Sequence, residues 1–383
     1  MPEYYYASPN DSERRSHRRS LAGRLFDFVI VIISIVVMVV VLLSYLATIV
    51  SPHRMWILSL LGLGAPFSYA VLVLLILYWV IRWRWKYAVP MILVALLGVG
   101  KVSRYYRITP MRDYSAQHTP ERGSFTVMTY NIGNFKPYYG IDQDPQHAVA
   151  TGAAVIDSLS PDIVCLQEYY PDLAARSERM MRLMEEYHTV QIAPETGQWY
   201  RQAILSRFKI LRSGYIMRPK TAVWADLLIR EDTVRVVNNH LQSTGITAFD
   251  SEYLTGHAYL LDTAREEKLR SIVSRFHDNC VVRADEADTI RGHLDSLAPA
   301  LQILCGDFND TPLSYTYRTL ARGLNDAFSE AGEGFSHTFR GFFDALRIDY
   351  IFSSDGFETL SYEVPEVPHS DHLPVLVRLK RTE

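Results

Sequence analysis

One segment decides the fold of this chain: Leu301-Gln302-Ile303-Leu304-Cys305-Gly306-Asp307-Phe308-Asn309-Asp310-Thr311-Pro312. Its apolar part predicts a buried strand that ends at a glycine. Asp307 and Asn309 follow two positions apart, so both side chains should leave the strand end on one side, with Phe308 pointing into the core. Pro312 ends the extended segment, and Ser314 can begin a helix.

A carboxylate and an amide side by side at a strand end suit phosphoester chemistry. The carboxylate of Asp307 can take a proton from water, and the amide of Asn309 can donate to a phosphate oxygen without adding negative charge. Taken alone, the pair is explained equally well as a turn. The rest of the chain has to decide between these two interpretations.

The 383 residues divide into a basic, apolar front and an acidic body. Through Arg112 there are 13 lysines and arginines against 4 aspartates and glutamates, and the remainder has 26 against 38. An acidic body argues against tight, sequence-independent binding to nucleic acid, which requires a basic surface.

Three uncharged apolar runs occupy the front of the chain. Residues 28–50 are enough to cross a hydrocarbon core of ~30 Å at ~1.5 Å per residue, and too many for a signal-peptide core. Residues 55–81 contain Gly62, Gly64 and Pro66, which predict a kinked helix or an interfacial piece leading into a span. Residues 87–100 are few for a span. We favour three spans over two, because a third helix would bury this run against its neighbours.

These runs define the expected domains and location. We expect a polar basic tail (residues 1–24), a transmembrane region of about three helices (25–102), a linker (103–119) and a catalytic domain (120–383). The arginine-rich amino terminus predicts a cytoplasmic start. Three spans then make this a multi-pass protein of the inner (plasma) membrane with its catalytic domain on the non-cytoplasmic side, whereas two spans would leave that domain in the cytoplasm.

From residue 124 onward, strand and helix patterns alternate. This mixture favours an α/β sandwich with helices outside the sheets. Besides the central strand, strands are predicted at residues 124–130, 163–166, 202–206, 222–229, 233–239, 347–352 and 374–379. Helices are predicted at residues 148–159, 177–187 and 262–276, with a polar segment after the last one.

Six segments of the chain place polar residues at predicted strand ends. Each has an ordinary explanation when taken alone, since a glutamate at a strand end is usually solvated and a single histidine usually belongs to the core or its rim. Their occurrence together, in one order along the chain, favours a shared site. The residues are Asn131, Glu168, His240, Asp307 with Asn309, Asp349, and Asp371 with His372.

This order resembles the endonuclease/exonuclease/phosphatase superfamily, which has the DNase I-like fold. The similarity covers roughly residues 120–380 and, with the apolar front, is that of a membrane-anchored, bacterial-type member. It implies a two-sheet β-sandwich flanked by helices and preceded by transmembrane helices. The segments that carry it are Thr129-Tyr130-Asn131, Leu166-Gln167-Glu168, Asn239-His240-Leu241, Gly306-Asp307-Phe308-Asn309, Arg347-Ile348-Asp349-Tyr350-Ile351 and Ser370-Asp371-His372-Leu373-Pro374.

The resemblance implies a divalent cofactor, Mg²⁺ or alternatively Mn²⁺. Glu168 would hold the metal, with Asn131 and Asp371 close to it. Asn131, Asn309 and His240 would bind phosphate. Oxygen ligands of this kind suit a hard cation.

The resemblance also assigns the catalytic residues. Asp307 would align the attacking water and accept its proton, while Asn309 orients the phosphate. His372, held by Asp349, would stabilise the charge that grows at phosphorus, and His240 would donate to the phosphate or assist the leaving group. These donors match the demand of phosphodiester hydrolysis, whose transition state places negative charge on the nonbridging oxygens.

The favoured function is therefore a membrane-anchored, Mg²⁺-dependent phosphoester hydrolase, a phosphodiesterase or phosphatase of the phosphodiesterase/endonuclease type, acting by in-line attack of water. The apolar runs and the acidic body favour small or lipid-linked phosphoesters over nucleic acid, and no protein partner is evident. A membrane-anchored nuclease is the alternative, and it would need a basic, aromatic groove to which Phe339, Arg340, Phe342 and Phe343 could contribute. A third possibility is an inactive binding or scaffold protein on the same fold.

Overall fold

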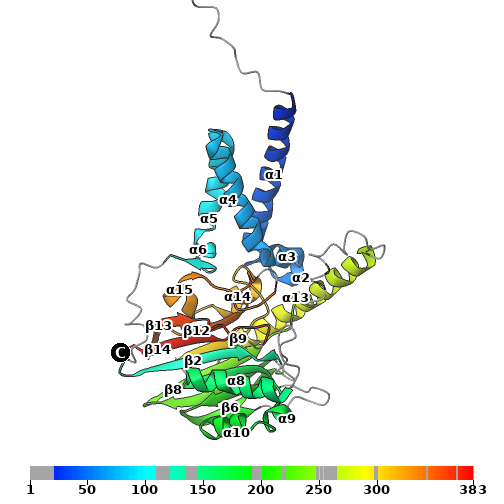
Figure 1. The fold of residues 1–383 in the computed structure, drawn as a ribbon. Helices are drawn as coiled ribbons and strands as arrows, with labels where there is room; N and C mark the ends of the chain where they lie inside the picture. Colours follow the sequence, from blue (N-terminus) through cyan, green and yellow to red (C-terminus); the bar gives the residue numbers. More distant parts are fainter. Residues whose placement is uncertain are drawn as a thin grey trace, which may run out of the picture.

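The computed structural model describes residues 21–108, 121–133, 145–191, 201–217, 221–246, 250, 253, 265–296, 301–341, 344–367 and 370–382. These residues form a sandwich of two mixed sheets with helices on its outer faces, and the amino-terminal helices extend away from it (Figure 1). The expected α/β sandwich is confirmed. The first 20 residues of the expected basic tail lie outside the described residues.

The first sheet carries the segment that ends in Asp307. Its six strands lie in the order β10-β12-β9-β8-β7-β6. β8 and β9 run parallel, and every other neighbouring pair runs antiparallel. The strands are β6 (Lys209–Met217), β7 (Ala222–Ile229), β8 (Asp232–His240), β9 (Gln302–Asp307), β10 (Asn325–Asp326) and β12 (Asp349–Ser353).

The second sheet has the order β13-β14-β2-β3-β5-β4. Here β2 and β3 are the parallel pair. A separate two-stranded sheet joins β1 (Tyr106–Arg107), which follows the amino-terminal helices, to β11 (Gly334–Phe335). The strands of the second sheet are β2 (Ser124–Asn131), β3 (Ile163–Tyr169), β4 (His188–Gln191), β5 (Arg201–Ser206), β13 (Phe357–Glu363) and β14 (Val375–Arg381).

The main core lies between the inner faces of the two sheets. Val127 and Cys165 of the second sheet pack there with Ile303 and Cys305 of the first. Leu304 points to the opposite face of its sheet, into a cluster beneath helices. Both faces of β9 are therefore covered, which explains why the strand is a continuous apolar run instead of an alternating one.

Helices cover the two outer faces of the sandwich. α8 (Pro145–Leu159) and α10 (Glu178–Glu185) pack on the second sheet, with the short α9 (Pro171–Ala174) beside them. α13 (Arg265–Ser296) and α14 (Tyr315–Leu320) pack on the first sheet, and α15 (Ala327–Ala331) contacts β12 and β13. The expected polar segment after residue 276 is wrong, because α13 continues to Ser296.

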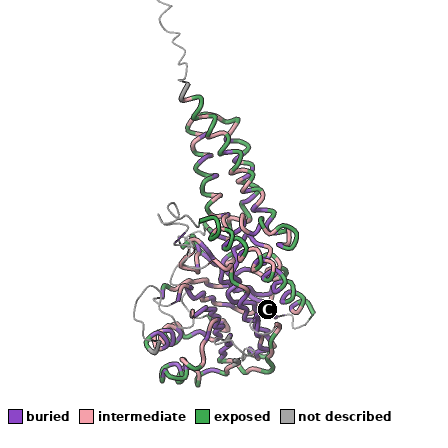
Figure 2. Tube along the Cα trace, turned by 90° about the vertical axis from the view of Figure 1, so that its right-hand side faces the viewer, coloured by how far each residue is buried: buried purple, intermediate pink, exposed green. Residues whose placement is uncertain are grey.

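The amino-terminal helices pack against one another and also carry many exposed apolar side chains along their length (Figure 2). α1 is apolar and long enough to cross a membrane from Gly23 to Leu46. α3 and α4 pass that test only together, and they are bent by 65° at Gly64, where the sequence predicted a kink. α5 is shorter than a span. The helices are α1 (Leu21–Leu46), α2 (Pro52–Met55), α3 (Ile57–Leu63), α4 (Ala65–Ile81), α5 (Trp85–Leu97) and α6 (Val99–Val102).

These helices contact the segment that follows Asp307. The Thr311 hydroxyl donates to the Gly62 carbonyl over 3.2 Å. A Cβ atom on Gly62 would lie 2.3 Å from the Leu313 carbonyl oxygen, so this close approach of two backbones requires glycine. The apolar helices and the strand-end segment therefore pack together without an intervening layer.

Candidate active site

Strand register places three predicted residues in one row across neighbouring strands of the first sheet. The row lies at the carboxyl ends of β8 and β9 and at the start of β12. His240 is the register partner of Asp307 across the parallel pair β8 and β9. Asp349 is the register partner of Asp307 across the antiparallel pair β9 and β12. All three side chains are buried. The row is a direct consequence of strand pairing, because register partners lie next to each other on one face.

The Asp307 carboxylate is held by three N–H donors. The backbone N–H of Asn309 lies 2.8 Å from Oδ1, and the Asn309 side-chain amide lies 3.1 Å from Oδ2. The Asn131 amide nitrogen, at the end of β2 in the other sheet, donates to Oδ2 over 3.0 Å. The site therefore spans both sheets, and these donors fix the orientation of the carboxylate.

Asn309 uses both of its amide hydrogens within the protein. Besides donating to Asp307, its Nδ2 atom donates to the Leu241 carbonyl over 3.0 Å. Donation to a phosphate would require breaking one of these bonds. The geometry therefore favours Asn309 as the residue that orients Asp307 and joins the ends of β8 and β9.

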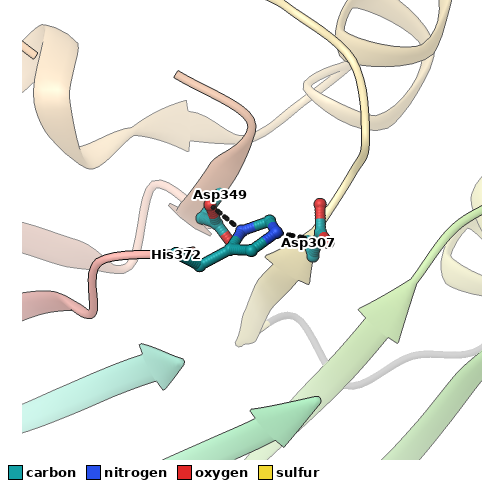
Figure 3. Close-up of side chains that lie close together, drawn as sticks. All are labelled: Asp307, Asp349 and His372. Carbon is teal, nitrogen blue, oxygen red and sulfur yellow. Dashed lines mark hydrogen bonds and ion pairs between the residues drawn. The ribbon is translucent and has the colours of Figure 1, made fainter. Parts of the chain in front are cut away.

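His372 lies between two carboxylates (Figure 3). Its Nδ1 atom is 3.0 Å from Oδ2 and 3.3 Å from Oδ1 of Asp349. Its Nε2 atom is 3.7 Å from Oδ2 of Asp307. The backbone N–H of His372 donates to the Ser370 hydroxyl over 3.0 Å, and that hydroxyl donates to the Asn131 carbonyl over 2.7 Å.

Burial and these neighbours shift two pKa values. Burial lowers the pKa of His372, but the charges of Asp349 and Asp307 outweigh it and raise the pKa well above the ordinary value. Burial raises the pKa of Asp307 to about 6, against the opposing effect of the His372 charge. The arrangement favours a protonated imidazole beside a carboxylate that is ionised near neutral pH.

Glu168 and His240 lie on the other side of Asp307. Nε2 of His240 is 3.7 Å from Oδ2 of Asp307 and 3.8 Å from Oε1 of Glu168. The Glu168 side chain is 27% exposed, whereas that of Asp307 is 1% exposed. Glu168 sits at the irregularity between Leu166 and Tyr169 in the pairing of β3 with β5. Irregularities of this kind are common beside functional sites, where they change the direction of a side chain.

Unusual backbone conformations gather at the site. Glu168, Asn309 and Ser370 are three of the seven described non-glycine residues with positive φ. Such residues persist only where their surroundings hold them, and they concentrate at functional sites. Gly306 has φ +134°, and a Cβ atom there would lie 1.9 Å from the Asn239 carbonyl oxygen. Glycine therefore lets β8 approach β9 directly beneath Asp307.

Among the described residues, one close cluster of side chains and one predicted set of oxygen ligands are candidates for a metal site. Asp307, Asp349 and His372 have ligand atoms within 4.8 Å of one another. However, His372 Nδ1 already contacts Asp349, and its raised pKa favours an imidazolium, whose ring nitrogens are both protonated and cannot coordinate a metal. This first group fits an acid–base pair better than a metal centre.

The second group consists of the predicted oxygen ligands Glu168, Asn131 and Asp371. Asn131 Oδ1 accepts from the Gly133 N–H over 3.0 Å, and a Cβ atom on Gly133 would lie 3.6 Å from Asp371 Oδ1. The amide and this carboxylate therefore share one neighbour. A set of carboxylate and amide oxygens with a partly exposed glutamate fits Mg²⁺ or Mn²⁺.

Two residues support the site in ways that the sequence did not predict. The Thr338 hydroxyl accepts the backbone N–H groups of Ile348 and Asp349, over 3.0 and 3.1 Å, and so fixes the start of β12. The Phe339 ring packs edge-on against the His372 imidazole, with centroids 5.1 Å apart. Neither stands at a predicted strand end, so no pattern singled them out for these roles.

The chain belongs to the endonuclease/exonuclease/phosphatase family, whose model matches residues 128–372. Family membership indicates a phosphoester hydrolase. A family described as a domain of unknown function matches residues 27–105, the amino-terminal helices. None of the curated proteins matches the chain significantly.

Several solved structures are similar to this chain. An endonuclease/exonuclease/phosphatase family protein from Bacteroides thetaiotaomicron is 20% identical over 67% of this chain and 97% of its own, with a TM-score of 0.48. A mannosyl-6-phosphatase from the same organism is 19% identical over 67% and 99%, with a TM-score of 0.47. The human nocturnin catalytic domain with bound sulfate is 20% identical over 68% and 95%, with a TM-score of 0.48.

Proposed function

We propose that this chain is a membrane-anchored, Mg²⁺-dependent hydrolase of phosphoesters that directs water onto phosphorus in line with the leaving group. The observation that carries the proposal is the Asp307 carboxylate, held by three N–H donors and 3.7 Å from an imidazole that is itself held by Asp349. A base and an acid thus lie side by side, each fixed by further residues.

Asp307 acts as the base that takes the proton of the attacking water. Its N–H donors leave the carboxylate oriented before substrate binds, so little reorganisation accompanies the reaction. With a pKa of about 6, it is mostly ionised at neutral pH yet basic enough to accept a proton. Asn309 holds it through both its backbone and its side chain.

His372 acts as the cation that stabilises charge on the phosphate. Asp349 keeps the imidazole protonated and fixes its ring through Nδ1, which leaves Nε2 to donate. His240 provides a second imidazole on the far side of Asp307, placed to bind the phosphate or assist the leaving group. Two donors on either side of the base suit a group whose charge is spread over several oxygens.

Glu168 would hold the metal ion, with Asn131 and Asp371 as the further oxygen ligands. When bound, the ion supplies positive charge to the phosphate and lowers the pKa of water. Asn131 would therefore serve both parts of the site, because its amide nitrogen donates to Asp307 while its oxygen, which accepts from the Gly133 N–H, is the proposed metal ligand.

Small or lipid-linked phosphoesters are the proposed substrates, with a nuclease as the alternative. Of the residues that could form a basic aromatic groove, Phe339 packs on His372 and Arg340 pairs with Glu366 over 3.0 Å. Phe342 and Phe343 lie outside the described residues. An inactive scaffold is disfavoured, because every predicted catalytic group is present.

The test is an activity screen with Mg²⁺ on bis(p-nitrophenyl) phosphate, sphingomyelin, phosphoinositides and single-stranded DNA. The proposal expects hydrolysis of the chromogenic ester and of at least one lipid. Cleavage of DNA alone would favour the nuclease, and inactivity on every ester would support the scaffold.

A further inference from the structure

α13 turns a stripe of polar side chains toward the catalytic segments. Asn279, Arg283 and Glu286 are spaced so that they share one face of the helix. Arg283 is 1% exposed and Glu286 is 5% exposed. Buried charges are costly unless they find partners, and an apolar residue would serve packing better. The hydrogen-bond partners of these three side chains therefore indicate their role.

All three side chains bind one residue, Gln242, two positions after His240. Its backbone N–H donates to Glu286 Oε2 over 2.6 Å, and its carbonyl accepts from Arg283 Nη1 over 2.8 Å. Its side-chain amide donates to Asn279 Oδ1 over 3.1 Å. The residue is thus fixed at both ends of its backbone and at its side chain.

Arg283 and Glu286 each bind a second residue besides Gln242. Glu286 also accepts from the Thr221 hydroxyl over 3.0 Å, and the Thr221 carbonyl accepts the backbone N–H of His240 over 2.8 Å. Arg283 Nε lies 3.3 Å from Asp310 Oδ2, next in the chain to Asn309. Arg283 therefore joins the two chain segments that carry His240 and Asn309, whereas Glu286 holds the His240 segment through both Gln242 and Thr221.

The backbone of Leu241 connects Gln242, which α13 holds, to Asp307, the proposed base. The Leu241 N–H donates to the Asp307 carbonyl over 3.0 Å, and the Leu241 carbonyl accepts from Asn309 over 3.0 Å. Residue 241 lies between the residue that α13 holds and the histidine of the site. A displacement of Gln242 would therefore move His240 and Asn309 relative to Asp307.

We propose that Arg283 and Glu286 are positioning residues of the hydrolase, which set the distances of His240 and Asn309 from Asp307; this inference rests on the proposed function. Neither residue touches the reacting atoms. Their effect is on orientation, and a misplacement of about 1 Å can cost ~10²-fold in rate.

The test compares Arg283→Met with Arg291→Met in the full chain. Arg291 is a matched control, because it is also buried on α13 but binds the Arg322 carbonyl over 2.7 Å and Asp295 over 2.7 Å, away from the catalytic segments. Steady-state hydrolysis of bis(p-nitrophenyl) phosphate gives kcat and KM, and thermal unfolding gives the loss of stability. Both variants should lower the melting temperature, but only Arg283→Met should lower kcat, by about 10- to 100-fold with KM little changed.

Two further variants keep the test decisive if Arg283→Met fails to fold. Glu286→Gln keeps the size of the side chain and one acceptor oxygen, so it should fold and lose kcat several-fold. Arg283→Met with Asp310→Asn removes both charges, and should restore the melting temperature without restoring kcat, because the bond to the Gln242 carbonyl is still lost.

The possible results distinguish a failure of the positioning role from a failure of the proposed hydrolase function. Equal kcat for Glu286→Gln, Arg291→Met and the wild-type chain would overturn the positioning role while the proposed function stands. Full recovery of kcat together with the melting temperature in the double variant would also overturn it, since a purely structural role predicts that result. An inactive wild-type chain would overturn the proposed function and this inference with it.

Discussion

The imidazole of His372 is joined to the carboxylate of Asp349 by a contact of 3.0 Å between Nδ1 and Oδ2. Asp349 is in turn the register partner of Asp307, so strand pairing brings the two carboxylates to either side of one ring. In the proposed reaction, one carboxylate maintains the charge of the imidazole and the other accepts a proton.

Replacing Asp349 with asparagine should remove the charge that keeps His372 protonated. We expect turnover of the chromogenic diester to fall by about 10²-fold or more, the range for a positioned proton-transfer group. His372→Ala should be similarly severe, and the double variant hardly worse than either, because residues that act as a unit are not additive. Rate losses that simply multiply would show that the pair does not act as a unit.

The pH–rate profile should be bell-shaped. Activity should rise as pH passes through about 6, where Asp307 loses its proton, because burial has raised the pKa of this carboxyl. It should fall at higher pH as His372 loses its own proton, above the ordinary histidine range because Asp349 and Asp307 outweigh burial. Asp349→Asn should move the alkaline limb to lower pH. An alkaline limb that stays in place in this variant would contradict the assignment of His372.

The Mg²⁺ requirement of the reaction should depend on Glu168. Excess EDTA should abolish activity, and Glu168→Gln should raise the Mg²⁺ concentration for half-maximal rate by at least about tenfold, since even residues behind the ligands cost 10- to 100-fold. The exposed Glu358 on β13 provides the control, and Glu358→Gln should leave the requirement unchanged. Full activity in EDTA would refute the metal-dependent scheme.

The catalytic domain should face away from the cytoplasm if three runs span the membrane. After expression in bacterial cells, protease added to spheroplasts should digest the chain beyond residue 112. Digestion only after the inner membrane is broken would mean that residues 87–100 do not span and that the domain is cytoplasmic.

Strand positions were predictable where both faces of a strand are covered. The runs before Asn131, Glu168, His240 and Asp307 are rich in apolar and β-branched residues, and each is a strand in the structure. β6 escaped prediction because it is an edge strand whose residues are mostly exposed or half-exposed. Such a strand lacks the alternation on which sequence reasoning depends.

The second half of α13 was not predicted as a buried helix because it is rich in charged residues. Its charged residues suggest a solvated segment beyond Phe276, yet Arg283 and Glu286 are buried against the ends of β7, β8 and β9. Their partners are backbone groups and an aspartate distant in sequence, so periodicity could not reveal the burial. The row of His240, Asp307 and Asp349 could be anticipated as a set of strand ends, but its geometry depends on strand register.

The most direct test of the account is the turnover of bis(p-nitrophenyl) phosphate by the Asp307→Asn variant in saturating Mg²⁺. Asparagine keeps the shape of the side chain but cannot act as a base, and Asp355→Asn, in the turn before β13, controls for a change of charge alone. We predict that Asp307→Asn loses at least about 10²-fold in kcat while the control keeps wild-type turnover. A folded Asp307→Asn variant with wild-type turnover would contradict the account.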